Sequence, residues 1–149
     1  MQITWTSKPF HDLSLLELHD ILQLRTEVFI VEQNCAFQDI DGQDAKAWHL
    51  LGQTAEGQLA AYARLFDAGQ CYAQVSIGRV VVAPAFRRFG LGKDLMREAI
   101  AHCEQRFGAQ SIKIGAQQYL TKFYQGFGFE QQGDMYLEDD IPHIYMLRA

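Results

Sequence analysis

Hydrophobic and polar positions follow two different periods along this chain, and together they predict a mixed domain of strands and helices. Alternating or nearly continuous apolar runs, bounded by glycine and polar residues, are typical of strands. Such runs occur at residues 2–7, 47–54, 58–66, 75–82, 111–117, 129–139 and 141–148. The second and third runs are joined by the residues AEG, which favour a hairpin, and the last two are spaced as a closing antiparallel pair.

Helical spacing separates these runs at three places. Ser14 and Glu17 are spaced as a capping box, which predicts a helix that begins directly after Ser14. The apolar face expected for this helix consists of Leu15, Leu18, Leu22, Val28 and Phe29. A second helix is predicted up to Phe107, because apolar residues recur every four positions from Leu91 onward and a glycine follows. A third, short helix is expected within residues 119–126.

The order of these elements is strand, helix, two strands, strand, helix, strand, helix, two strands. This order predicts an α/β (α+β) fold, with helices packed on a mixed, largely antiparallel sheet. A chain of 149 residues is long enough to bury one sizeable core, and no sequence repeat or linker divides it. We therefore expect a single domain that spans residues 1–149.

Composition narrows the classes of partner. Hydrophobic residues make up 48% and charged residues 21% of the chain, as in ordinary globular proteins, and the net charge is −5. Because the sequence has no basic tract and no long apolar run, nucleic acid and membrane are not expected as partners. The 3 cysteines are far apart and form no C-x-x-C pair, so neither a disulfide framework nor a metal site is expected. A reduced, cytoplasmic location fits this composition best.

The stretch FRRFGLGKDLM, residues 86–96, holds the clearest candidate chemistry. It places glycines and cationic side chains at the start of the second predicted helix, where backbone N–H groups and the helix dipole favour an anion. A dinucleotide-binding loop needs a third glycine where Leu95 stands, and a P-loop needs glycine at Arg87 and Ser or Thr at Asp94. Both are therefore excluded. The pattern leaves two alternatives, a phosphate-binding R-x-x-G-x-G turn and a solvated basic turn.

Two segments of the sequence resemble motifs of a known superfamily. VVVAPAFRRFGLGKDLM resembles the coenzyme A-binding motif of the GNAT N-acetyltransferases, a strand and turn followed by [QR]-x-x-G-x-[GA] at a helix start. Further along the chain, AQQYLTKFYQGFGF resembles the second motif of that superfamily. The segments LRTEVFIVEQNCAFQDIDGQD, HLL, ARL, IGRVVV and PHI are similar to the ElaA family within it, so the resemblance covers nearly the whole chain.

The resemblance implies a GNAT fold and an N-acetyltransferase in which an amine attacks the thioester of acetyl-CoA directly, in a ternary complex. It implies that the coenzyme is held, largely by backbone groups, at Val80, Val81, Val82, Arg87, Arg88, Phe89, Gly90, Leu91, Gly92 and Lys93. Gln117 stands where the superfamily usually has asparagine, and its amide is also expected to contact the coenzyme.

Tyr124 matches the superfamily tyrosine that protonates the leaving thiolate. Without the resemblance, the local sequence favours an aromatic side chain that packs beside Phe123 and Phe127. A primary amine, with a pKa of about 10.4, is mostly protonated at neutral pH, so a base is expected as well. Glu32 is the first candidate, because the motif EVFIVEQ places it beside the expected acceptor cleft. Further candidates, each with a structural alternative, are Glu27, Asp39, Asp41, His49 and His143.

The acceptor is expected to be an amine of a small molecule or a peptide. Acidic residues favour a cationic acceptor if they line its entrance, and they cluster at Asp39, Asp41, Asp44, Glu138, Asp139 and Asp140. Two other functions stay open, a coenzyme A-binding module without catalysis and transfer of a longer acyl chain. An exposed strand near the C-terminus would favour a homodimer.

Overall fold

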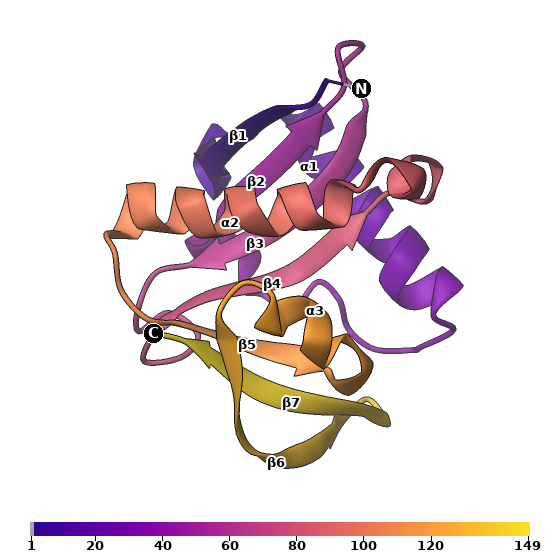
Figure 1. Cartoon of the computed structure of the whole chain (residues 1–149). Helices are drawn as coiled ribbons and strands as arrows, with labels where there is room; N and C mark the ends of the chain where they lie inside the picture. The colour runs from indigo at the N-terminus through magenta and orange to yellow at the C-terminus, as the bar shows by residue number, and fades with distance from the viewer. Residues whose placement is uncertain (1) are drawn as a thin grey trace.

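A sheet of 7 strands runs through the molecule in the order β1-β2-β3-β4-β5-β7-β6 (Figure 1). The computed structural model describes residues 2–149. The strands are β1 (Thr4–Pro9), β2 (Trp48–Gln53), β3 (Leu59–Phe66), β4 (Val75–Val82), β5 (Ile112–Gln117), β6 (Phe129–Glu138) and β7 (Ile141–Arg148). Neighbouring strands are antiparallel except for β4 and β5, which are parallel. The mixed, largely antiparallel sheet expected from the element order is thus confirmed.

Helices cover both faces of this sheet (Figure 1). They are α1 (Leu15–Arg25), the π-helical segment η2 (Thr26–Glu32), α2 (Leu91–Phe107), α3 (Thr121–Gln125) and the 3-10 turns η1 (Phe10–Asp12), η3 (Asp44–Lys46), η4 (Pro84–Phe89) and η5 (Gln118–Leu120). On one face of the sheet, α2 buries the apolar residues that the sequence places at every fourth position, and α1 with η2 covers the other face. Within residues 2–149, no helix is long and apolar enough to cross a membrane.

The start of α1 is as predicted, and of the predicted apolar face Val28 and Phe29 pack in the core beyond the end of α1, while the buried face of α1 itself differs. The Ser14 hydroxyl accepts the Glu17 N–H at 3.0 Å, and the Glu17 carboxylate accepts the Ser14 N–H at 2.8 Å, which completes the capping box. Leu15, expected in the core, is 88% exposed. The buried residues are Ile21, Leu24 and Arg25. Apolar residues surround most of this helix, so their spacing leaves its orientation open, and the buried face is the one that includes a charged side chain.

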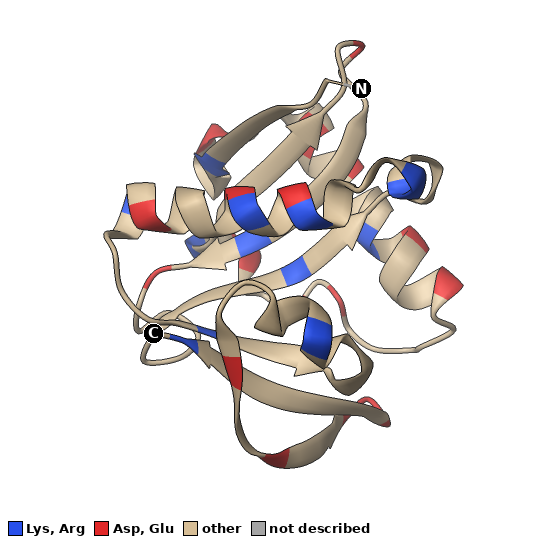
Figure 2. Cartoon of the chain, in the orientation of Figure 1, with Lys and Arg blue, Asp and Glu red and all other residues tan. Residues whose placement is uncertain are grey.

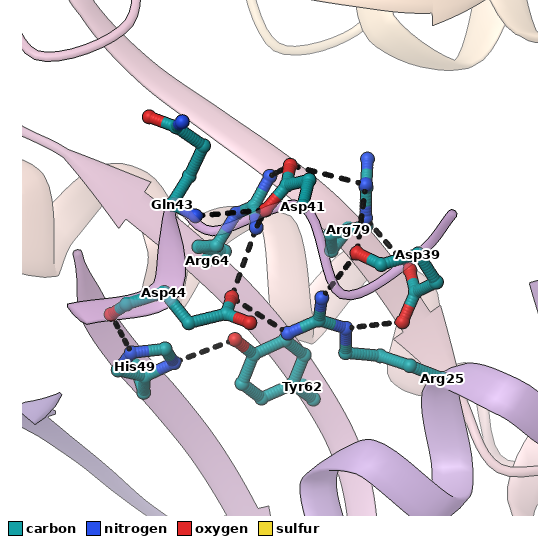
Figure 3. A network of polar contacts seen from close by, with 9 residues as sticks. All are labelled: Arg25, Asp39, Asp41, Gln43, Asp44, His49, Tyr62, Arg64 and Arg79. Atoms are coloured by element: carbon teal, nitrogen blue, oxygen red, sulfur yellow. Dashed lines mark hydrogen bonds and ion pairs between the residues drawn. The ribbon is translucent and has the colours of Figure 1, made fainter. Parts of the chain in front are cut away.

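That charged side chain belongs to a buried network of ion pairs (Figure 3). Three arginines, one each from α1, β3 and β4, bind three aspartates in the segment between η2 and β2. The pairs and their shortest distances are Arg25–Asp39 (2.9 Å), Arg25–Asp44 (2.8 Å), Arg64–Asp41 (2.9 Å), Arg64–Asp44 (2.9 Å), Arg79–Asp39 (2.8 Å) and Arg79–Asp41 (3.3 Å). The network therefore fixes a polar segment to three separate elements of the fold.

These contacts overturn one expectation from the sequence. The carboxylates of Asp39, Asp41 and Asp44 are bound to arginines inside the protein, so they do not line an acceptor entrance. Burial raises the pKa of Asp41, but hydrogen bonds from Arg64 and from the Gln43 N–H outweigh it and lower the pKa to about 2. For Asp44 burial again opposes ionisation, and the hydrogen bonds from its arginines outweigh it and lower its pKa.

We expect Asp44→Asn to lower the free energy of unfolding by about 3 kcal/mol at pH 7, because it leaves two buried guanidinium groups with too little negative charge. A carboxyl whose pKa is lowered by folding stabilises the protein fully above its unfolded pKa of ~3.9, and this stabilisation is lost as the pH falls through the folded pKa. The deficit of the variant should therefore shrink below about pH 4. Urea unfolding at pH 7 and below about pH 4 measures the difference in the free energy of unfolding between variant and wild type. Asp134→Asn, at an exposed carboxylate, is the control. A variant as stable as the wild type at pH 7 would contradict the role given to the network.

Candidate active site

A cleft opens where β4 and β5 separate. The two strands are paired only at Val75–Ile112 and Ser76–Lys113. Beyond these pairs lies a cleft of about 480 Å³, whose walls include residues 77–82 of β4 and residues 114–117 of β5. Because β4 pairs with β3 along its other edge, the backbone groups on its cleft side are available to an extended ligand.

A bulge in β4 lies on this wall. Tyr62 faces Val81 and Arg64 faces Gly78, so two steps along β3 correspond to three along β4. Within the bulge Arg79 has a φ of 50°, a left-handed conformation that is costly for any residue except glycine. The guanidinium of Arg79 is held by Asp39 at 2.8 Å. The ion-pair network therefore stabilises a bulge that redirects backbone groups of β4 beside the cleft.

The glycine turn lies at the start of α2, next to β4. Gly90 has a φ of 67° and precedes the helix, whose first turn receives no side-chain cap. A Cβ added at Gly90 would meet no atom within 4 Å, and one at Gly92 would meet only the Phe123 ring at 3.9 Å. Open space at uncapped helical N–H groups suits a phosphate. Of the neighbouring residues assigned to the coenzyme, Arg88, Phe89 and Lys93 are exposed and Leu91 is buried in the core.

Tyr124 of α3 lies at the cleft and is only 8% exposed. Its ring packs edge-on against Phe123 and Phe129, with centroids 5.2 and 6.1 Å away. The same side chain therefore contacts both the core and the cleft. Burial, with a smaller effect of Tyr119, raises the pKa of Tyr124 to about 12. The phenol therefore keeps its proton at neutral pH, as a hydrogen-bond donor to the cleft more than as a strong acid. Gln117, at the end of β5, lines the same cleft.

Glu32 and Arg87 meet across the same cleft. Both oxygens of the Glu32 carboxylate accept from the Arg87 guanidinium, at 2.6 and 2.9 Å, and both residues line the cleft. Figure 2 shows basic residues on the turn before α2 and acidic residues on the helix that follows α1. The hydrogen bonds from Arg87 lower the pKa of Glu32, which makes this carboxylate a weaker base while the pair is intact.

The far part of the cleft combines residues without a predicted role with two members of the predicted acidic cluster and with one of the candidate bases. Cys35 and Phe37 come from the segment that the ion-pair network fixes, and Glu138 and Asp139 come from the end of β6 and the turn after it. The thiol of Cys35 lies 3.8 Å from the carbonyl oxygen of Asp139, so the two segments touch. His143 of β7 lines the cleft between them and is 7% exposed. Their common place becomes visible only once the sheet is assembled.

The other candidate bases lie elsewhere. Glu27 is exposed on η2, outside the residues that line the cleft. His49 is fully buried in the ion-pair network, where its Nε2–H donates to the Asp44 carbonyl at 2.9 Å and its Nδ1 accepts from the Tyr62 hydroxyl at 2.7 Å. Both ring nitrogens are thus occupied, which is the structural alternative that a strand histidine favours.

With this geometry in view, comparisons with known proteins identify the family. The model of the acetyltransferase (GNAT) domain matches residues 17–148. The chain belongs to the GNAT acetyltransferase family. ElaA of Escherichia coli is 41% identical over 148 residues, which cover 98% of this chain and 96% of that protein. A UPF0039 protein of Synechocystis is 41% identical over 147 residues, which cover 99% of this chain and 96% of that protein.

Solved structures agree with this membership. An acyl-CoA N-acyltransferase from Pseudomonas aeruginosa superposes with a TM-score of 0.94 at 45% identity, and the match covers 99% of this chain and 100% of that one. The crystal structure of E. coli ElaA gives a TM-score of 0.91 at 40% identity, with the same coverage. The GNAT fold and the likeness to ElaA, both expected from the sequence motifs, are thereby confirmed.

Membership of the GNAT family makes the chain an N-acyltransferase, and enzymes of this fold take acyl-CoA as the donor. The residues present fit such a donor, since a strand with unused backbone groups and Arg87, which precedes the open glycine turn, border one cleft. In the part of the chain that the structure describes, no group of three or more His, Cys, Asp or Glu side chains could hold a metal ion.

Proposed function

We propose that this GNAT protein transfers the acetyl group of acetyl-CoA to a primary amine of a small molecule or peptide, by direct attack in a ternary complex. The observation that carries the proposal is the single cleft between β4 and β5, which borders the bulged strand, Tyr124 and Arg87 together. Direct transfer needs donor and acceptor in one space, and a cleft of about 480 Å³ suits two small reacting groups.

The donor is placed by backbone contacts. The extended arm of the coenzyme pairs with Val80, Val81 and Val82, as an added strand would, and its pyrophosphate lies at the turn around Gly90. A backbone N–H beside the bulge then donates to the thioester oxygen, which gains charge as the amine attacks. Such contacts depend on main-chain geometry, which explains how valine and glycine serve as site residues.

The reaction forms one C–N bond and breaks one C–S bond. The neutral amine attacks the thioester carbon, and coenzyme A leaves as a thiolate. Tyr124 donates a hydrogen bond to that sulfur, and as its proton moves to the thiolate the phenol regains one from the new amide nitrogen. The amine, present mainly as an ammonium ion, must lose a proton beforehand. The sequence assigns this step to Glu32, whose pairing with Arg87 weakens it as a base in the structure described here.

The direct test is release of free thiol from acetyl-CoA, measured across a panel of primary amines, aminoglycosides and peptides. We expect at least one amine to give saturable, protein-dependent release. Saturable binding of acetyl-CoA without release on any amine would instead indicate a coenzyme-binding module. Faster thiol release from a longer acyl-CoA than from acetyl-CoA would show that the transferred group is the longer acyl chain and not acetyl.

Gly90→Glu should weaken coenzyme A binding at least tenfold relative to Gly90→Gln, while both variants stay folded. The two substitutions share the same backbone strain at a φ of 67° and nearly the same volume, so they differ in charge. The added carboxylate would repel the pyrophosphate. Isothermal titration with coenzyme A measures the difference, and equal affinities would rule out a pyrophosphate at this turn.

Tyr124→Phe should lower kcat about 10²-fold or more and leave the KM for acetyl-CoA nearly unchanged, because it removes one proton donor from a ring that stays packed. Steady-state thiol release gives both constants, and an unfolding midpoint close to that of the wild type confirms that the packing survives. Unchanged kcat would remove Tyr124 from the chemistry.

A further inference from the structure

We infer that His143 is the base that takes the proton from the acceptor ammonium, a role that rests on the proposed function. His143 lies on β7 opposite Gln117 of β5, in the part of the cleft formed with Glu138 and Asp139. Tyr124 borders the same cleft from α3. The donor and the acceptor of protons therefore border one space, as direct transfer requires.

Local geometry decides which nitrogen of His143 can accept a proton. The Nδ1 atom lies 2.7 Å from the carbonyl oxygen of Ile141. A carbonyl oxygen can only accept, so Nδ1 carries the hydrogen and donates it. In the neutral ring the lone pair is then on Nε2. The turn before β7 thus holds this imidazole in one tautomer, with a fixed base at Nε2.

A carboxylate lies close to Nε2. The nearest charged neighbour of this nitrogen is the Glu138 carboxylate at 3.5 Å, which stabilises the imidazolium that forms. Tyr136 of β6 packs against the ring, with centroids 5.8 Å apart. The other charged or titratable residues that line the cleft are Glu32, Cys35, Arg79, Arg87, Tyr119, Tyr124 and Asp139. Arg79 is itself bound by Asp39 and Asp41, so its charge is balanced by these carboxylates.

His143 suits the proton transfer better than Glu32 does. Glu32 is 43% exposed in its side chain and is bound at both oxygens by Arg87. His143 is nearly buried, and the single bond that orients it leaves Nε2 to receive a proton. Once the amine has been deprotonated and consumed, the imidazolium returns its proton to water. The step moves one proton and needs no further reactant.

The test compares His143→Asn with the wild type in thiol release at saturating amine, over a range of pH. Asn places an N–H donor where Nδ1 stands, so the bond to Ile141 is kept while the base is removed. We expect kcat to fall about 10²-fold or more, and the decline of wild-type kcat on the acid side, in the range where an imidazole titrates, to disappear. His19→Asn, at a histidine 72% exposed on α1, is the matched control.

Glu138→Gln keeps the imidazole and provides a second readout, which decides the matter even if His143→Asn does not fold. We expect its acid-side decline to move to lower pH, because the imidazolium loses its carboxylate neighbour. Suppose that the wild type is active. If His143→Asn is then as active as the wild type, or if the pH profile of Glu138→Gln is unchanged, the role of His143 is overturned while the proposed function stands. Loss of the acid-side decline in Glu32→Gln, but not in His143→Asn, would assign the base to Glu32. A wild type that releases no thiol with any amine defeats the proposed function itself.

Discussion

The divergence of β4 from β5 is the constraint on which the whole site depends. Two parallel strands that paired along their full length would leave no cleft, and α2 and α3 would then cover a closed sheet. The divergence coincides with the bulge at Arg79, where β4 takes one residue more than its partner β3. One irregularity in the backbone thus lies in the wall of the cleft at which we propose that the donor binds.

The ion-pair network stabilises this irregular backbone conformation. A left-handed arginine inside a strand is unfavourable by itself, and Asp39 and Asp41 hold its side chain. The same aspartates bind arginines of α1 and β3, so the segment that carries Phe37 is fixed against the sheet. Buried charges rarely add net stability, but ion pairs that join several elements can specify one arrangement of them. Here the arrangement specified is the shape of the cleft.

Much of the fold follows from local patterns in the sequence. The capping box at Ser14 and the regular stripe of α2 depend on neighbours within a few residues, and the glycine turn is recognisable by its motif, so all three could be predicted. The face of α1 could not, because apolar residues surround that helix and Leu15 fits the pattern as well as a buried residue does. The ion-pair network does have one local signal in the sequence, Arg64 inside an apolar strand, because a buried arginine needs carboxylate partners.

The candidate site divides in the same way. The turn around Gly90, where we propose that the donor binds, is a contiguous motif that the sequence alone shows, whereas the far part of the cleft joins residues from β6, β7 and the segment after η2 that only the assembled sheet brings together. Hydrogen–deuterium exchange with and without coenzyme A tests the central claim, that the donor lies between β4 and β5. We predict slower exchange on binding at residues 77–82 and 90–93, with β1 and β2 unchanged. Protection confined to other segments, or none in these two, would contradict the account.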